Sequence, residues 1–149
     1  MFHDHSYESK LRQLAEQIGL DGSVTFTGIQ NNVRELMNQL DVFVHASTNG
    51  EPFGRVVGEP MAAGKPVVVT NGGAIPKIVD HQDSGLVLPM CDPAAMANAI
   101  GWLIGNPQRA KPMGEKGRER FHECFTTQSA VRRVEEIYEI VLQTHRLRC

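Results

Sequence analysis

The sequence of 149 residues is 41% hydrophobic and 21% charged, which is typical of a chain that folds around one core and not of a disordered one. Its formal net charge is −2 and its lysines and arginines are scattered, which argues against nucleic acid as the main partner. No stretch approaches the roughly 20 consecutive apolar residues of a transmembrane helix.

The N-terminus and the cysteines indicate a cellular compartment. Residues 1–5 lack the basic and apolar regions of a signal peptide. The three cysteines are widely spaced and form no Cys-x-x-Cys pair, which suits a reducing compartment and gives no zinc site. Two nearby histidines, His3 and His5, make no specific metal site either. We therefore expect a cytoplasmic protein that needs no metal and no cofactor. If the sequence is part of a longer protein, that protein could be peripheral to the membrane.

The first part of the chain predicts a helix, a strand and a second helix. Apolar residues recur at helical spacing and stop before Gly19, a typical end of a helix: Tyr7, Leu11, Leu14, Ala15 and Ile18. Residues 24–27 are predicted to form a short strand that ends at Gly28, and Asn31 or Asn32 then caps the second helix. Because ligands of open parallel sheets bind at the carboxyl ends of strands, the loop after this strand is a candidate wall of a binding site. An ordinary turn is an equally good interpretation.

The middle of the chain predicts a βαβ unit. Apolar residues 42–44 predict a buried strand, residues 48–50 a loop, residues 54–63 a helix and residues 67–69 a second buried strand. The rest of the chain is expected to be arranged around this unit.

The last part of the chain continues the alternation of strands and helices. The predicted elements are a loop at 71–73, a short helix at 75–79, a strand at 86–88, and helices that start near Pro93 and cover 107–124 and 127–144. The order predicts an α/β fold, a Rossmann-like parallel β-sheet flanked by helices and joined by right-handed crossovers. Without a linker, repeat or low-complexity stretch, residues 1–149 are expected to form one domain.

Two carboxylates flank the start of the central helix. Glu51 lies in the loop before the helix and Glu59 within it, with seven residues between them. Since a helix rises about 1.5 Å per residue, Gly54 and Glu59 are roughly 7 to 8 Å apart along the axis, the span of a nucleotide diphosphate. Ionised carboxylates accept hydrogen bonds from vicinal hydroxyls but repel phosphate. The spacing therefore suits Glu51 to the hydroxyls of a sugar and Glu59 to those of a ribose.

The entrance of this helix offers backbone N–H groups to an anion. The residues expected to contact a sugar and a diphosphate are Glu51, Pro52, Phe53, Gly54, Arg55 and Val56. A cation in the first helical turn opposes the helix dipole by about 0.3 to 1 kcal/mol. We therefore expect an anion beside Arg55, either a phosphate or the carboxylate of Glu51 or Glu59.

Simpler interpretations remain open for several of these residues. Glu51 could act only to compensate the helix dipole, and Glu59 could be a solvated acid on the helix surface. Phe53 could belong to the core, with a backbone N–H that matters more than its ring. His45, at the end of the central strand, either faces the site or is a buried, hydrogen-bonded histidine.

Several motifs stand in register between about Leu11 and Tyr138. They are residues 41–47 (DVFVHAS), residues 51–54 (EPFG), Glu59, residues 61–68 (MAAGKPVV), the Gly72-Gly73 pair and residues 85–89 (GLVLP). Taken together, they resemble the donor-binding half of the retaining glycosyltransferases of family 4, which have the GT-B fold.

The resemblance implies a fold and an activity. This chain would be one half of a GT-B fold, without the N-terminal acceptor domain and without the first strand of this half, which carries a phosphate-binding Arg and Lys in the family. The whole protein would transfer a hexose from a nucleoside diphosphate sugar, such as UDP-glucose, to an acceptor hydroxyl in glycan or polysaccharide synthesis, with retention of configuration. Glu51 would orient the sugar as the catalytic residue and Glu59 would bind the ribose. The loop of Gly28, Ile29 and Gln30 would contact the base.

Two other functions are considered. A nucleotide-sugar-binding module without catalysis, or an inactive fragment of a longer enzyme, fits the same motifs. A dinucleotide-dependent dehydrogenase does not, because no Gly-x-Gly-x-x-Gly follows the first strand. The expected partners are therefore a nucleoside diphosphate sugar and the N-terminal domain of a parent protein.

Overall fold

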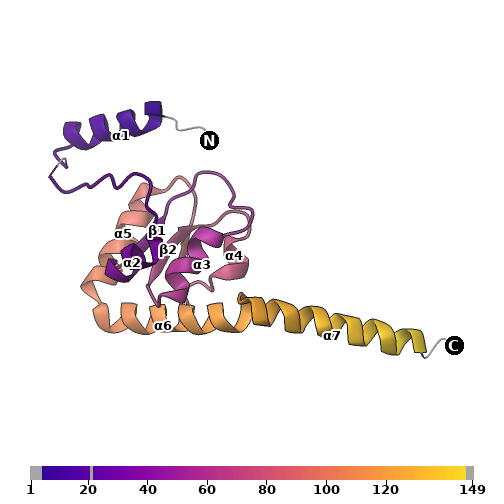
Figure 1. Cartoon of the computed structure of the whole chain (residues 1–149). Coiled ribbons are helices and arrows are strands. Elements are labelled where there is room, and N and C mark those ends of the chain that lie inside the picture. The colour runs from indigo at the N-terminus through magenta and orange to yellow at the C-terminus, as the bar shows by residue number, and fades with distance from the viewer. Residues whose placement is uncertain (1–4, 21, 147–149) are drawn as a thin grey trace. The chain divides into compact units, whose positions relative to one another are not determined.

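The computed structural model describes residues 5–20 and 22–146, and the side chains of residues 6–20 and 22–144. The chain forms two units, residues 1–31 and residues 32–149, each with its own internal contacts. Figure 1 shows the elements of both units.

Helix α1 (His5–Gln17) is the regular element of the first unit in the described part of the chain. Gly19 follows it with a φ of 71°, a left-handed conformation that glycine adopts without a steric penalty, so the predicted end of this helix is confirmed. The guanidinium of Arg12 lies 4.2 Å from the centre of the Phe26 ring, which brings the segment after the helix back against it.

The predicted strand at residues 24–27 is wrong. These residues have an irregular backbone, and the described residues of the first unit contain no other strand with which they could form a ladder. A strand is stabilised by hydrogen bonds to a neighbouring strand, and this segment has none within its unit. The loop after it consequently does not lie at the carboxyl end of a strand. In this loop Gly28 has a φ of 60°, Ile29 is exposed, and the side-chain amide of Gln30 donates to the carbonyl of Thr27.

The second unit contains a parallel sheet of three strands, β1 (Phe43–His45), β2 (Val67–Thr70) and β3 (Leu86–Leu88), in the order β1-β2-β3. Phe43 pairs with Val67, and Val68 pairs with Leu86. The three valines of the central strand are fully buried, as expected for a strand covered on both faces.

Helices join and follow these strands. They are α2 (Val33–Gln39), α3 (Arg55–Ala62), α4 (Ile75–Ile78), α5 (Pro93–Gly105), α6 (Pro107–Cys124) and α7 (Thr127–Arg146). Each corresponds to a predicted helix within a few residues, and the bounds of α6 are those that the sequence predicted. The α/β fold with a parallel sheet flanked by helices is confirmed.

The two faces of the sheet carry separate hydrophobic cores. Side chains alternate between the faces along a strand, so Val67 and Val69 point to one core and Val68 to the other. The first core joins β2 to α3 and α4 through Val57, Met61, Val67, Val69, Ile75, Ile78 and Val79. The second core joins the sheet to α5 and α6 through Val68, Leu86, Ala99, Leu103, Ala110 and Met113.

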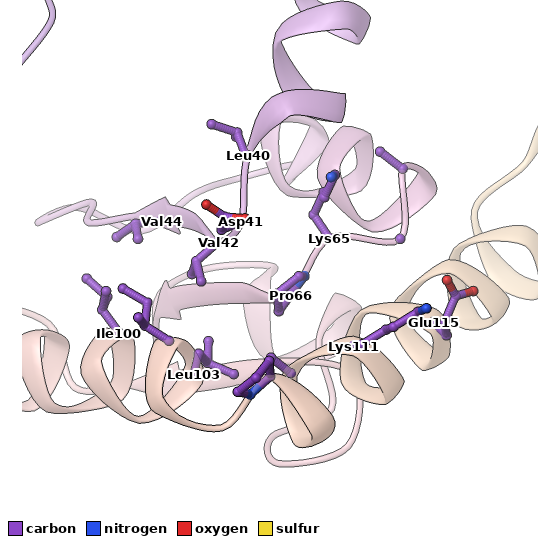
Figure 2. A pocket seen from close by; sticks show the side chains of 15 residues that line it. Leu40, Asp41, Val42, Val44, Lys65, Pro66, Ile100, Leu103, Lys111 and Glu115 are labelled. Atoms are coloured by element: carbon purple, nitrogen blue, oxygen red, sulfur yellow. The ribbon is translucent and has the colours of Figure 1, made fainter.

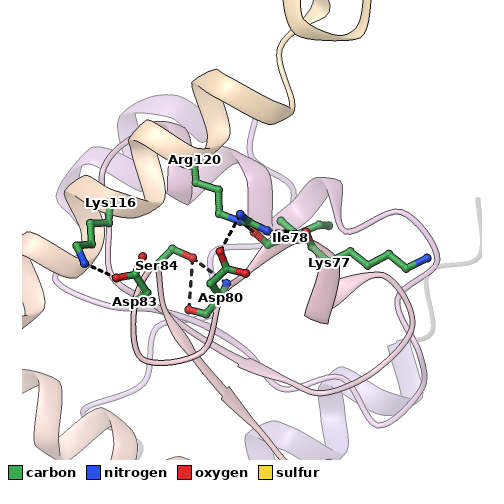
Figure 3. A network of polar contacts seen from close by, with 7 residues as sticks. All are labelled: Lys77, Ile78, Asp80, Asp83, Ser84, Lys116 and Arg120. Carbon is green, nitrogen blue, oxygen red and sulfur yellow. Dashed lines mark hydrogen bonds and ion pairs between the residues drawn. The ribbon is translucent and has the colours of Figure 1, made fainter. Parts of the chain in front are cut away.

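A polar network ties α6 to the connection between α4 and β3 (Figure 3). The Nε of Arg120 donates to the carbonyl of Ile78 over 2.7 Å, and an Nη donates to the carbonyl of Lys77 over 3.0 Å. The other Nη of Arg120 pairs with Asp80 at 2.7 Å, and Lys116 pairs with Asp83. Arg120 therefore satisfies the carbonyls that α4 leaves unpaired at its C-terminal end.

Candidate functional site

The site begins where β1 and β2 end. The hydroxyl of Thr70, at the end of β2, donates to the carbonyl of Ser47 over 2.8 Å and approaches that of His45 at 3.4 Å. The hydroxyl of Ser47 donates to the carbonyl of Asn49 over 2.6 Å. These bonds fix the path of the chain as it leaves β1, so the loop that carries Glu51 starts from a defined position.

The backbone of Glu51 is held by the segment before α4. Its carbonyl accepts a hydrogen bond of 2.8 Å from the N–H of Ala74, and Glu51 forms an isolated parallel bridge with Gly73. Gly73 has a φ of 61°, and a Cβ at this position would overlap the backbone carbonyl of Glu51. Glycine is therefore required for this close approach. The bridge places the Glu51 loop against a segment 22 residues later in the chain.

The carboxylate of Glu51 caps α3. Its Oε1 accepts a hydrogen bond of 3.3 Å from the N–H of Gly54, the residue before the helix, which has a φ of 63°. The expectation that the Gly54 N–H is free for a ligand is therefore wrong, because this carboxylate already satisfies it. The interpretation of Glu51 as an acid that compensates the helix dipole therefore applies to Oε1, and Oε2 takes no part in this bond.

Three other backbone donors at this helix entrance have no partner among the residues that the structure describes. They belong to Phe53, Arg55 and Val56. Pro52 and Phe53 are exposed, and Phe53 retains 79% of its accessible surface, which excludes it from the core. The entrance of α3 is therefore open, and its unpaired N–H groups give it positive character.

Glu59 lies one helical turn after Arg55, and both side chains are exposed. Their neighbours Val57, Gly58 and Met61 are buried against the sheet. Neither charged side chain forms an ion pair within residues 22–144, so neither Glu51 nor Glu59 is the anion expected beside Arg55, and the phosphate stays a prediction. The contact of Glu59 with a ribose, and of the loop 28–30 with a base, stay predictions.

His45 was the more ambiguous of the sequence candidates. Its Nε2 is inaccessible to solvent and has no hydrogen-bond partner within the described part of the chain. The nearest carboxylate oxygen, Oε2 of Glu51, lies 3.9 Å away. The interpretation as a buried, hydrogen-bonded histidine is therefore wrong for this nitrogen, which faces the site without a bond.

Two cavities lie elsewhere in the second unit. The first, of about 760 Å³, is lined by Asp41 and Val44 of the β1 region, by Lys65 and Pro66 before β2, and by α5 and α6 (Figure 2). The second, of about 790 Å³, lies between β3, α5 and α6. Neither includes a predicted site residue, although the first is lined in part by the motifs at residues 41–47 and 61–68. Within the described residues, no three His, Cys, Asp or Glu side chains gather as they would around a metal ion, and no helix is long and apolar enough to cross a membrane.

The chain is similar to known proteins over most of its length. A family model described as "Glycosyl transferases group 1" matches residues 4–120. The N-acetyl-alpha-D-glucosaminyl L-malate synthase of Bacillus anthracis is 34% identical over 131 residues, which cover 88% of this chain and 34% of that protein. This chain thus spans about a third of the length of that relative.

The fold of this chain is also similar to that of solved structures. Anabaena Alr3699/HepE in complex with UDP superimposes with a TM-score of 0.87 and 28% identity, over 93% of this chain and 38% of that one. Its complex with UDP-glucose gives a TM-score of 0.86. Sucrose-phosphate synthase from Thermosynechococcus elongatus gives a TM-score of 0.81 and 29% identity, over 96% of this chain and 36% of that one.

Proposed function

The chain belongs to the glycosyl transferases of group 1, and we propose that it binds the nucleoside diphosphate sugar of a glycosyltransferase. The proposed donor is a UDP-hexose such as UDP-glucose. Anabaena Alr3699/HepE, a structural neighbour of this chain, was solved with UDP and with UDP-glucose, which supports this choice of nucleotide.

The open entrance of α3 is the proposed diphosphate site. The N–H groups of Phe53, Arg55 and Val56 lack partners among the described residues, and the positive end of the helix dipole favours an anion there. The exposed guanidinium of Arg55 adds a full positive charge at the same end. These groups would compensate the charge of a diphosphate without a metal ion, and we expect its affinity to be the same in EDTA and in Mg²⁺.

Glu51 is proposed to orient the donor sugar as the catalytic residue. One oxygen caps α3 through the Gly54 N–H, and this bond leaves Oε2 and the remaining lone pairs to accept hydrogen bonds from sugar hydroxyls. This division of the carboxylate is the observation that carries the proposal, because it sets an acceptor for hydroxyls directly beside the donors for a phosphate. Glu59, exposed one turn into α3, is proposed to bind the ribose.

The proposal is tested by calorimetry on the 149-residue chain with UDP, UDP-glucose, ADP-glucose and GDP-mannose. We expect binding of UDP and UDP-glucose, and an increase in stability of about 2.7 kcal/mol when the ligand is at about 100 times its Kd. Arg55→Ala should weaken both UDP ligands, whereas Arg118→Ala, which removes an exposed ion pair with Glu115 on α6, should not. The absence of binding by all four nucleotides would refute the proposal.

Transfer itself is proposed for the longer proteins of this family, in which a second domain would bind the acceptor. The assignment to family 4, the retention of configuration and the role in glycan synthesis belong to this part of the proposal. A second candidate, which fits the same motifs, is binding of the nucleotide sugar without transfer by this chain. A transfer assay with radiolabelled UDP-glucose on the 149-residue chain tests the second candidate, which turnover would refute.

A further inference from the structure

His45 presents a buried polar atom that the proposed function does not use. The residue ends β1, and its ring is only 21% exposed. Its Nε2 is inaccessible to solvent and unpaired within the described chain. A buried donor or acceptor that lacks a partner destabilises the folded state, because it has lost its hydrogen bonds to water. Such an atom is expected to have a partner in the working state of the site.

Glu51 is the partner that the geometry offers. Its Oε2 lies 3.9 Å from the Nε2 of His45, and no other carboxylate lies within ion-pair distance of this ring among residues 22–144. The gap exceeds a hydrogen bond by about 1 Å. A rotation of the carboxylate can close it, because the backbone of Glu51 is fixed by Ala74 and Gly73, whereas its side chain is hydrogen-bonded only through Oε1 among the described residues.

We propose that the Nε2–H of His45 donates a hydrogen bond to Oε2 of Glu51, and that His45 is a positioning residue for the carboxylate that binds the donor sugar. This inference rests on the proposed function of Glu51. The carboxylate then has two anchors, the Gly54 N–H on one oxygen and the imidazole on the other. Two anchors fix its plane, and each oxygen keeps a lone pair for a sugar hydroxyl.

The proposed contact acts on the sugar and not on the nucleotide. His45 lies at the end of β1, whereas the proposed diphosphate site is the entrance of α3. Among the described residues, His45 forms no hydrogen bond or ion pair with residues 53–56 of that entrance. Loss of His45 should therefore loosen the orientation of the Glu51 carboxylate and weaken the binding of UDP-glucose, while the affinity for UDP stays the same. A residue that only stabilised the fold would change both affinities together.

The contact is tested first by nuclear magnetic resonance of the histidine rings in the 149-residue chain without ligand. We expect His45 to be in the tautomer with the proton on Nε2, and Glu51→Gln to change the ¹⁵N shift of Nε2. Glu59→Gln is the matched control and should leave that shift unchanged. His81 serves as an internal reference, since its Nδ1 accepts a hydrogen bond of 3.0 Å from the N–H of Val87. A proton on Nδ1 of His45, or a ¹⁵N shift of Nε2 that is the same in the wild type and in Glu51→Gln, would overturn the contact.

The positioning role is tested by calorimetry with UDP and UDP-glucose. His45→Leu should weaken UDP-glucose by about tenfold, which corresponds to about 1.4 kcal/mol, with UDP unchanged. His45→Gln should retain most of the affinity, because its amide can donate in place of Nε2. His81→Gln is the control and should change neither affinity.

The outcomes separate this inference from the proposed function. Equal losses of UDP and UDP-glucose in His45→Leu, or an equal loss of UDP-glucose in His45→Gln and His45→Leu, would overturn the positioning role. A wild-type chain that binds neither ligand would refute the proposed function and with it the positioning role, and the resonance measurement would then decide whether the two side chains are in contact.

Discussion

At the scale of the residue, Glu51 combines a structural and a proposed chemical role. Its Oε1 caps α3 through the N–H of Gly54, and its Oε2 faces the unpaired nitrogen of His45. A carboxylate accepts hydrogen bonds at both oxygens, so Oε2 can still accept one after Oε1 has bonded to Gly54. The substitution that separates the two roles is Glu51→Gln, because the amide oxygen can still cap the helix while the charge is lost.

We predict that the two acids of the site affect the binding of different parts of the ligand. Glu59→Gln should weaken UDP by about 10- to 100-fold, since a hydrogen bond from a hydroxyl to a charged acceptor contributes about 1.5 to 3 kcal/mol. Glu51→Gln should leave UDP unchanged and weaken UDP-glucose. In a longer glycosyltransferase that includes this sequence, Glu51→Gln should lower kcat, because the sugar gains positive charge in the transition state, and Glu59→Gln should mainly raise KM.

Calorimetry on the chain and steady-state kinetics on a longer glycosyltransferase that includes it measure these effects. Glu119→Gln, on the exposed surface of α6, is the control and should change neither. Loss of UDP binding in Glu51→Gln with turnover intact, or the reverse in Glu59→Gln, would show that the two roles are exchanged.

At the scale of the element, the site depends on the contact between the Glu51 loop and the segment before α4. The contact requires glycine at position 73, where the φ is 61° and a Cβ would overlap the carbonyl of Glu51. Neither the loop nor the segment can yield easily, because the bond from Ala74 to the same carbonyl holds them together.

Gly73→Ala should therefore destabilise the chain by about 1 to 3 kcal/mol, as expected for a strained backbone position. Gly101→Ala is the matched control: this glycine lies within α5 and a Cβ there meets nothing within 4 Å, so alanine should stabilise the helix by about 0.5 to 1 kcal/mol. Unfolding in urea measures both changes, and a Gly73→Ala chain as stable as the wild type would contradict the requirement for glycine.

Arg120 supports α4 from the other end. It donates to the carbonyls of Lys77 and Ile78 and pairs with Asp80 (Figure 3). Arg120→Ala should destabilise the chain by about 1.5 to 3 kcal/mol, because two hydrogen bonds from a charged donor are lost, one of them at the partly buried carbonyl of Ile78. Arg118→Ala should cost at most about 1 kcal/mol, since its pair with Glu115 is exposed. Equal losses for the two arginines in urea unfolding would contradict the role of Arg120.

The elements of the second unit were predictable because their signals are local. Residues 67–69 are apolar without interruption, and a run of this length between turns forms a strand buried on both faces. Residues 24–27 show how such a signal fails: the alternation of Val24 and Phe26 indicates which side chains a strand would bury, but it does not provide the neighbouring strand.

The candidate site shows the same limit. The sequence indicated Glu51 and the helix that starts after Gly54, because both belong to one continuous motif. It could not indicate the bridge from Glu51 to Gly73 or the approach of His45 to Glu51, because these contacts join segments that only the fold brings together. The free N–H of Gly54 was predicted without allowing for a side chain that could occupy it.

At the scale of the whole molecule, α7 differs from the other helices of the second unit. Its apolar residues recur at helical spacing, which predicts a buried face. In the structure the large apolar side chains of this helix are at least half exposed: Val131, Val134, Ile137, Tyr138, Ile140, Val141 and Leu142. The two hydrophobic cores of this unit are built without them.

We therefore predict that this apolar face contributes little to the stability of the chain. Ile137 is 60% exposed, and Ile137→Lys removes little buried surface while lysine retains a high helix propensity. The free energy of unfolding should change by no more than about 0.5 kcal/mol. Leu103 of α5 is the matched comparison, since it is 1% exposed in the second core, and Leu103→Ala should cost about 2 to 5 kcal/mol because it leaves a cavity. Urea unfolding of both variants measures the difference, and a loss in Ile137→Lys as large as that in Leu103→Ala would mean that α7 is packed in solution and belongs to the core.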